Sequence, residues 1–90
     1  MGIVAVKIKL MPISPDTNLE TMEAEAKETI EKNQGETPKF EKEPIAFGLN
    51  ALFVIFAWPE EKELEGLENQ LKKIKNVNSV QVIDIRKAFG

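Results

Sequence analysis

Residues 44–58 read Pro-Ile-Ala-Phe-Gly-Leu-Asn-Ala-Leu-Phe-Val-Ile-Phe-Ala-Trp and join a sharp bend to the most apolar run of the chain. Phe47 is followed by Gly48, a residue type that adopts positive φ angles without steric cost. The pair predicts a tight reversal with an aromatic side chain at the bend. Two interpretations of Phe47 are open: its ring packs in the core, as buried aromatic rings commonly do, or it is an anchor offered to a partner protein.

The segments on either side of this bend predict strands of different character. Residues 49–58 are apolar at odd and even positions, as expected of a central strand covered at least in part on both faces, and Pro59 ends the run. Residues 36–42 alternate only weakly and are largely charged, with Pro38 near their start and Pro44 just beyond their end. Charges and prolines suit an edge strand that recruits no further neighbour.

The two ends of the chain predict the other strands. Residues 4–10 alternate between apolar side chains at even positions and Ala5, Lys7 and Lys9 at odd positions, so the even positions predict a buried face. Residues 80–85 also carry an apolar pattern, but its phase changes by one between Val82 and Ile83. This change indicates either a β-bulge or the edge of strand pairing, and residues 86–90 are expected to form a tail.

Two segments have the apolar periodicity of amphipathic helices. The apolar stripe of the first consists of Leu19, Met22, Ala26 and Ile30. Thr17 and Glu20 predict a capping box at its start. The apolar stripe of the second consists of Leu64, Leu67, Leu71 and Ile74. Glu60, Glu61 and Glu63 are expected in its first turn, where carboxylates interact favourably with the helix dipole.

The order of these elements is β-α-β-β-α-β, which predicts a ferredoxin-like α+β fold. The two crossover connections place both helices on one face of a four-stranded antiparallel sheet. The first and third strands are the least charged, so they are expected in the centre. A chain of 90 residues has room for one such layered unit, and residues 1–90 are predicted to form a single domain.

The composition narrows the chemistry that is expected of this chain. The sequence has no cysteine, histidine or tyrosine, and its formal net charge is −3. Disulfides, thiol nucleophiles and the usual zinc ligands are therefore missing, and so is the commonest general acid or base. We expect a protein that is not an enzyme and that binds neither a metal nor a cofactor. No apolar run has the length of a membrane span, and no secretory signal precedes the first strand, so we expect a cytoplasmic protein that does not bind membranes.

The predicted sheet has a second face that the helices do not cover. The strand parity places Phe53 and Ile55 on this open face, beside Ile3 and Ala5, with lysines around them. An exposed apolar patch commonly marks an interface, and a weak homodimer or a terminus lying across the sheet would also cover it. Residues 53–56, Phe-Val-Ile-Phe, match the end of the RNA-recognition signature, but its basic opening is absent. Because the net charge is also acidic, direct binding of nucleic acid is the less favoured alternative.

Three segments carry a resemblance to a known family. They are residues 11–15, Met-Pro-Ile-Ser-Pro; residues 44–49, Pro-Ile-Ala-Phe-Gly-Leu; and residues 82–87, Val-Ile-Asp-Ile-Arg-Lys. Together they resemble the archaeal elongation factor 1-beta family, which corresponds to the exchange domain of the eukaryotic elongation factor 1-beta subunits. The resemblance covers essentially the whole chain.

The resemblance implies a function and a set of site residues. Members of this family are guanine-nucleotide exchange factors for elongation factor 1-alpha, the GTPase that carries aminoacyl-tRNA to the ribosome. By position, the resemblance assigns the bend of Ile45, Phe47 and Gly48 to partner binding, with the Phe47 ring entering a hydrophobic pocket of the GTPase. Eukaryotic members disturb the magnesium and phosphate site with a lysine next to the C-terminus. Here the basic residues nearest the end are Arg86 and Lys87, which the resemblance suggests for this role.

Exchange is compatible with the residues that this chain contains. An exchange factor needs no nucleophile and no metal ligand, because it acts by binding the nucleotide-free GTPase more tightly than the GDP-bound form. The alternative from another functional class is a ferredoxin-like interaction module without exchange activity, dimeric through its open sheet face.

Overall fold

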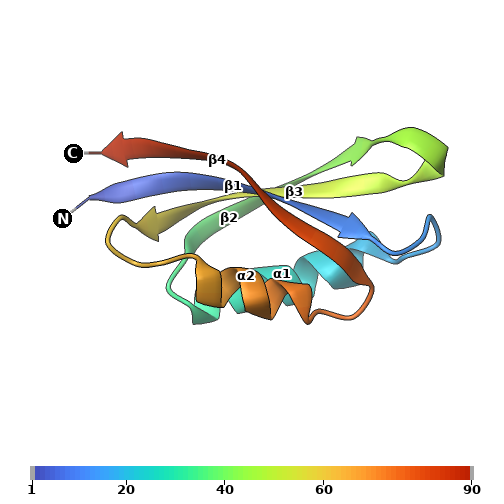
Figure 1. The fold of residues 1–90 in the computed structure, drawn as a ribbon, viewed down its shortest axis with the longest axis horizontal. Helices are drawn as coiled ribbons and strands as arrows, with labels where there is room; N and C mark the ends of the chain where they lie inside the picture. Colours follow the sequence, from blue (N-terminus) through green and yellow to red (C-terminus); the bar gives the residue numbers. More distant parts are fainter. Residues whose placement is uncertain (1, 90) are drawn as a thin grey trace.

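The computed structural model describes residues 2–89, with side chains described as far as Lys87. The elements are β1 (Ile3–Pro12), α1 (Leu19–Lys32), β2 (Glu36–Pro44), the 3₁₀ turn η1 (Ala46–Gly48), β3 (Asn50–Pro59), α2 (Glu65–Lys72) and β4 (Val77–Phe89). They form one antiparallel sheet in the order β2-β3-β1-β4, with both helices on one face (Figure 1). The ferredoxin-like α+β prediction is confirmed, with β1 and β3 in the centre and β2 and β4 at the edges.

The core lies between the sheet and the helices and follows the predicted parity. The strands contribute Val6, Ile8 and Leu10 from β1 and Leu52, Val54, Phe56 and Trp58 from β3. The helices contribute Met22, Ala26, Ile30, Leu67 and Leu71. The rings of Phe56 and Trp58 meet edge to face, with centroids 5.7 Å apart. Because these side chains are buried on one side of the sheet, the alternate positions of the central strands form the open face.

Of the two alternatives at the change of apolar phase, the β-bulge is the one present in β4. Lys7 of β1 pairs with Asp84, whereas the next residue, Ile8, pairs with Val82. Ile83 is thus the extra residue of the bulge, at the position where the apolar phase changes. The bulge keeps Val82 against the core and turns Asp84 to the open face.

The start of α1 differs from the predicted capping box by one residue. Asn18 is the N-cap, and its Oδ1 accepts hydrogen bonds from the backbone N–H groups of Glu20 and Thr21 at 3.0 and 3.2 Å. The Thr17 N–H instead donates to the Ser14 carbonyl at 3.2 Å, which keeps Thr17 in the preceding turn. The capping box of Thr17 and Glu20 was therefore wrong, because asparagine supplies an equally good cap one position nearer the helix.

The start of α2 was also placed too early. Glu60, Glu61 and Glu63 precede the helix, and its first-turn acids are Glu65 and Glu68. The chain first makes a turn in which the Lys62 N–H donates to the Pro59 carbonyl at 3.1 Å. The Trp58 indole Nε1–H donates to the Lys62 carbonyl at 2.9 Å, and this bond holds the turn against the core.

A network around Lys62 joins this turn to the end of α1. Lys62 Nζ donates to the Asn33 carbonyl at 2.5 Å and to Gln34 Oε1 at 3.3 Å, and it lies 5.1 Å from the centroid of the Trp58 ring. The Asn33 amide donates to Gln70 Oε1 of α2 at 2.9 Å. These contacts fix the two helices relative to each other.

Residues 86–90 were expected to form a tail beyond the last strand. This expectation is wrong for residues 86–89, which belong to β4, and Gly90 lies outside the described residues. β4 continues to Phe89 because β1 offers it pairing partners: Ala5 pairs with Arg86, Val4 with Lys87 and Ile3 with Phe89.

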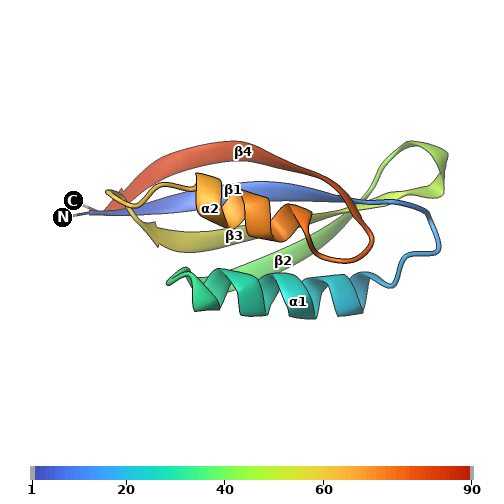
Figure 2. The same cartoon turned by 60° about the horizontal axis from the view of Figure 1, so that its bottom comes forward.

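The molecule is elongated, with extents of 41 × 21 × 18 Å. The β1–α1 and β2–β3 loops lie at one end in both views, and the two ends of the described chain lie together at the other (Figures 1 and 2). The topology causes this arrangement, because β3 and β4 both pair antiparallel with β1. β3 therefore begins at the end of the sheet where β1 finishes, and β4 finishes at the opposite end, where β1 begins.

Candidate functional site

The β2–β3 loop has a defined backbone conformation. β2 and β3 pair up to Pro44 and Asn50, where the ladder ends. Beyond this pair, the Ile45 N–H donates to the Leu49 carbonyl at 2.8 Å, and the Leu49 N–H donates to the Ala46 carbonyl at 3.3 Å. These bonds close the loop on itself, so its apex is held in one arrangement.

Phe47 is at this apex and is 93% exposed. Its backbone is left-handed, with φ 63° and ψ 31°, and Gly48 follows with φ +74°. A left-handed conformation costs a residue with a Cβ atom roughly 1–2 kcal/mol. The fold accepts this strain and an exposed aromatic ring without any burial in return, so the interpretation of Phe47 as a core residue is wrong. Strain of this kind is typical of functional sites.

Gly48 and Ile45 support the loop in different ways. A Cβ atom added at Gly48 would meet nothing within 4 Å, so the backbone angle alone favours glycine at this position. Ile45 is half-buried in an extended conformation at the base of the loop. The structure thus brings Ile45, Phe47 and Gly48 together at one end of the molecule.

Arg86 and Lys87 lie at the other end, on opposite faces of β4. Arg86 pairs with Ala5, whose side chain is on the open face, and Lys87 pairs with Val4, which packs against the core. Arg86 Nε donates to Asp84 Oδ2 at 2.6 Å, and Lys87 Nζ is 3.9 Å from Glu60 Oε2. Their side chains remain 81% and 59% exposed, so both cations are accessible to a partner.

The sequence did not reveal two features of these candidate residues. The positive φ of Phe47 was missed, because only the glycine beside it indicates a left-handed position. The separation of Phe47 from Arg86 and Lys87 was also missed. The signal for it was available in the predicted strand order, since antiparallel neighbours of β1 must end where β1 begins.

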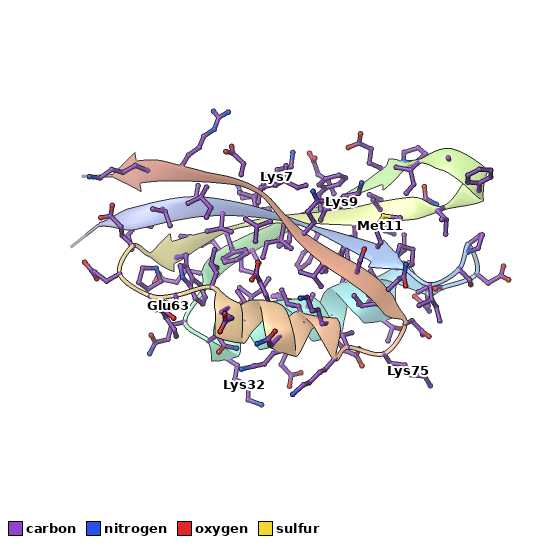
Figure 3. The ribbon with its side chains drawn as sticks, viewed as in Figure 1. Lys7, Lys9, Met11, Lys32, Glu63 and Lys75 are labelled. Carbon is purple, nitrogen blue, oxygen red and sulfur yellow. The ribbon has the colours of Figure 1, made fainter. Side chains whose placement is uncertain are left out.

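Among the side chains that the structure describes, one aromatic ring lies on the open face, and lysines partly cover it. Phe53 pairs with Lys9 and is half-buried. Lys7 Nζ and Lys9 Nζ lie 5.1 and 6.0 Å from its ring centroid, and Figure 3 shows both lysines on β1. Ile55 pairs with Lys7 and is 42% exposed, whereas Phe56 points into the core. The patch is therefore small and mixed in character.

The described residues offer few groups from which a buried polar site, a metal site or a membrane span could be formed. No polar or charged side chain is buried among the residues that the structure describes. Within residues 2–89, no three His, Cys, Asp or Glu side chains lie close enough together to hold a metal ion. The helices of this part of the chain are too short and too polar to cross a membrane.

Comparison with known proteins indicates the functional class to which the chain belongs. Residues 5–88 match the family model of the EF-1 guanine nucleotide exchange domain. The chain is 41% identical over 87 residues to elongation factor 1-beta of Methanococcus aeolicus, which covers 94% of this chain and 97% of that protein. It is 41% identical over 88 residues to elongation factor 1-beta of Methanothermobacter thermautotrophicus, covering 97% of this chain and 98% of that protein. Elongation factor 1-beta of Methanocaldococcus jannaschii is 37% identical over 86 residues, covering 94% and 97%.

The chain belongs to the family of EF-1 guanine nucleotide exchange domains. The resemblance read from the three sequence segments is confirmed. As a member of the EF-1 exchange family, the protein has a nucleotide-exchange role in translation elongation. The family match spans both the Phe47 loop and the end of β4 that carries Arg86 and Lys87.

Proposed function

We propose that this protein releases GDP from the GTPase elongation factor 1-alpha by contacting it at two separated points. Phe47 is the anchor at one end of the molecule, and Arg86 or Lys87 acts at the other. The observation that carries this proposal is the exposed Phe47 ring, held 93% accessible on a strained backbone.

The Phe47 ring supplies binding free energy that the folded protein does not use. Burying an aromatic ring in a pocket of a partner contributes about 2–3 kcal/mol, and single aromatic residues commonly dominate an interface. Because the loop is already closed by the bonds of Ile45 and Leu49, little conformational entropy is lost on docking. The result is a strong contact from a small surface.

Binding alone does not release a nucleotide, since the factor must prefer the nucleotide-free GTPase. A cation brought near a bound magnesium ion or its carboxylate ligands competes for the same charges. Arg86 and Lys87 each have a carboxylate neighbour that a partner site can replace, Asp84 and Glu60 respectively. Exchange by this route requires no covalent chemistry, so the protein is not an enzyme in the proposed mechanism.

Release of fluorescent GDP from archaeal elongation factor 1-alpha tests the proposal. We expect the wild-type protein to accelerate release, and Phe47→Ala to reduce the acceleration by at least about tenfold. Ile55→Ala, on the open face, is the matched control and should keep full activity. Full activity of Phe47→Ala would refute the role of Phe47 as an anchor. If the wild-type protein does not accelerate GDP release, the proposed function itself is refuted.

Self-association through the open face is a second candidate, and the exposure of Ile55 favours it. Shallow hollows of about 230 and 340 Å³ lie on either side of this residue. A patch so small supports only weak association. Sedimentation at high protein concentration should detect a weak dimer that Ile55→Lys abolishes, and a strict monomer would refute this candidate.

A further inference from the structure

Ile13 is a second large apolar side chain that the fold leaves in solvent. It is 59% exposed and directly follows Pro12, the buried last residue of β1. It is not among the side chains that form the core or pack against it. The apolar surface of Ile13 is therefore not used by the core.

The β1–α1 loop holds Ile13 in a fixed place. The Ile13 N–H donates to the Asn76 carbonyl at 3.0 Å, which ties the loop to the turn before β4. The Asp16 N–H donates to Ser14 Oγ at 3.1 Å, and prolines at positions 12 and 15 restrict the backbone on both sides. The side chain is therefore presented from a rigid loop, as Phe47 is.

Ile13 lies at the Phe47 end of the molecule. Both views place the β1–α1 and β2–β3 loops at the same end (Figures 1 and 2). The β1–α1 loop also meets the base of the Phe47 hairpin, because Asn50, the first residue of β3, lines one small hollow with Pro12, Ser14 and Pro15. The other large exposed apolar side chains described, Ile55, Ile83 and Ile85, belong to strands β3 and β4.

We infer that Ile13 and Phe47 form a two-part apolar contact that docks on one continuous surface of the GTPase. This inference rests on the proposed function and adds to it a residue that sets the orientation of docking. A single ring in a pocket leaves rotation about its own axis free, whereas a second rigid apolar point removes that freedom. Two fixed points at one end thereby direct the far end of β4 to one place on the partner.

Ile13→Ser tests the inference in a binding measurement with nucleotide-free elongation factor 1-alpha. We expect the dissociation constant to rise about tenfold, because the variant loses the burial of one aliphatic side chain. Ile13→Leu should bind within about twofold of wild type, since it keeps the apolar surface. Ile83→Ser, an equally drastic change at a 43% exposed isoleucine away from both loops, is the matched control and should not alter binding.

The outcomes separate this inference from the proposed function. Phe47→Ala is measured beside the Ile13 variants, and thermal unfolding of each variant confirms that it is folded. If Phe47→Ala weakens binding and Ile13→Ser does not, the two-part contact is refuted and the anchor stands. If neither substitution weakens binding, the Phe47 anchor is refuted and the two-part contact with it.

Discussion

At the residue scale, Phe47 combines a strained backbone conformation with an aromatic side chain that is exposed to solvent. Its φ of 63° lies in a region that asparagine occupies far more readily than a bulky aromatic residue does. Phe47→Asn should therefore raise the free energy of unfolding by roughly 0.5–1 kcal/mol. Chemical denaturation measures this gain. The same variant should lose exchange activity, so stability and function are expected to change in opposite directions.

A close approach of neighbouring side chains favours glycine at position 35. A Cβ atom here would overlap Ile30 Cγ2 and lie 3.2 Å from Phe56 Cδ2. Gly35→Ala should lower the free energy of unfolding by about 1–3 kcal/mol, as overpacking does. Gly66→Ala is the contrasting variant, because its Cβ would enter open space on α2, where alanine is the better helix former by about 1 kcal/mol. Equal effects of the two substitutions in thermal unfolding would contradict this account.

At the element scale, the Lys62 network holds α1 and the β3–α2 turn together. Lys62→Met keeps the aliphatic stem but removes the bonds to Asn33 and Gln34 and the cation near Trp58. We expect the free energy of unfolding to fall by about 1–2 kcal/mol in denaturation experiments. Lys27→Met, on the exposed side of α1, should change it little. Both variants should retain exchange activity, since neither lysine lies at the Phe47 end or in β4.

The elements also show which local sequence signals were sufficient to predict the structure. The parity of β1 and β3 predicted the core, and the phase change after Val82 marked the position of the bulge at Ile83. These predictions held because strand periodicity depends on which face is buried, a property visible in neighbouring residues. The helix starts were less accurate. Asn18 and Thr17 are both good caps, and tertiary bonds of the loops selected between adjacent starting points.

At the scale of the whole molecule, the proposed anchor and the proposed cations are at opposite ends of a body 41 Å long. Substitutions at the two ends share no neighbours, so their effects on exchange should multiply. Phe47→Ala should mainly raise the factor concentration that gives half-maximal GDP release. Lys87→Gln or Arg86→Gln should mainly lower the maximal rate of GDP release, which is reached at saturating factor concentration.

Salt provides a further distinction between the two ends. The contribution of Arg86 or Lys87 should shrink as ionic strength rises, because exposed charges are screened, whereas the Phe47 effect should persist. Release rates of the single and double variants at low and high salt measure this. A double variant no worse than Phe47→Ala alone would show that the cations have no separate role.

The sequence by itself determined the order of the elements, the buried faces of the central strands and a glycine-assisted bend beside Phe47. These are local properties, since burial on one face repeats with the period of the strand or helix. Only the tertiary structure decided that the Phe47 ring stands in solvent and that β4 continues through Arg86 and Lys87. The continuation of β4 depends on pairing with β1, a segment distant in the chain, and the exposure of Phe47 depends on no other part of the described chain covering the β2–β3 loop.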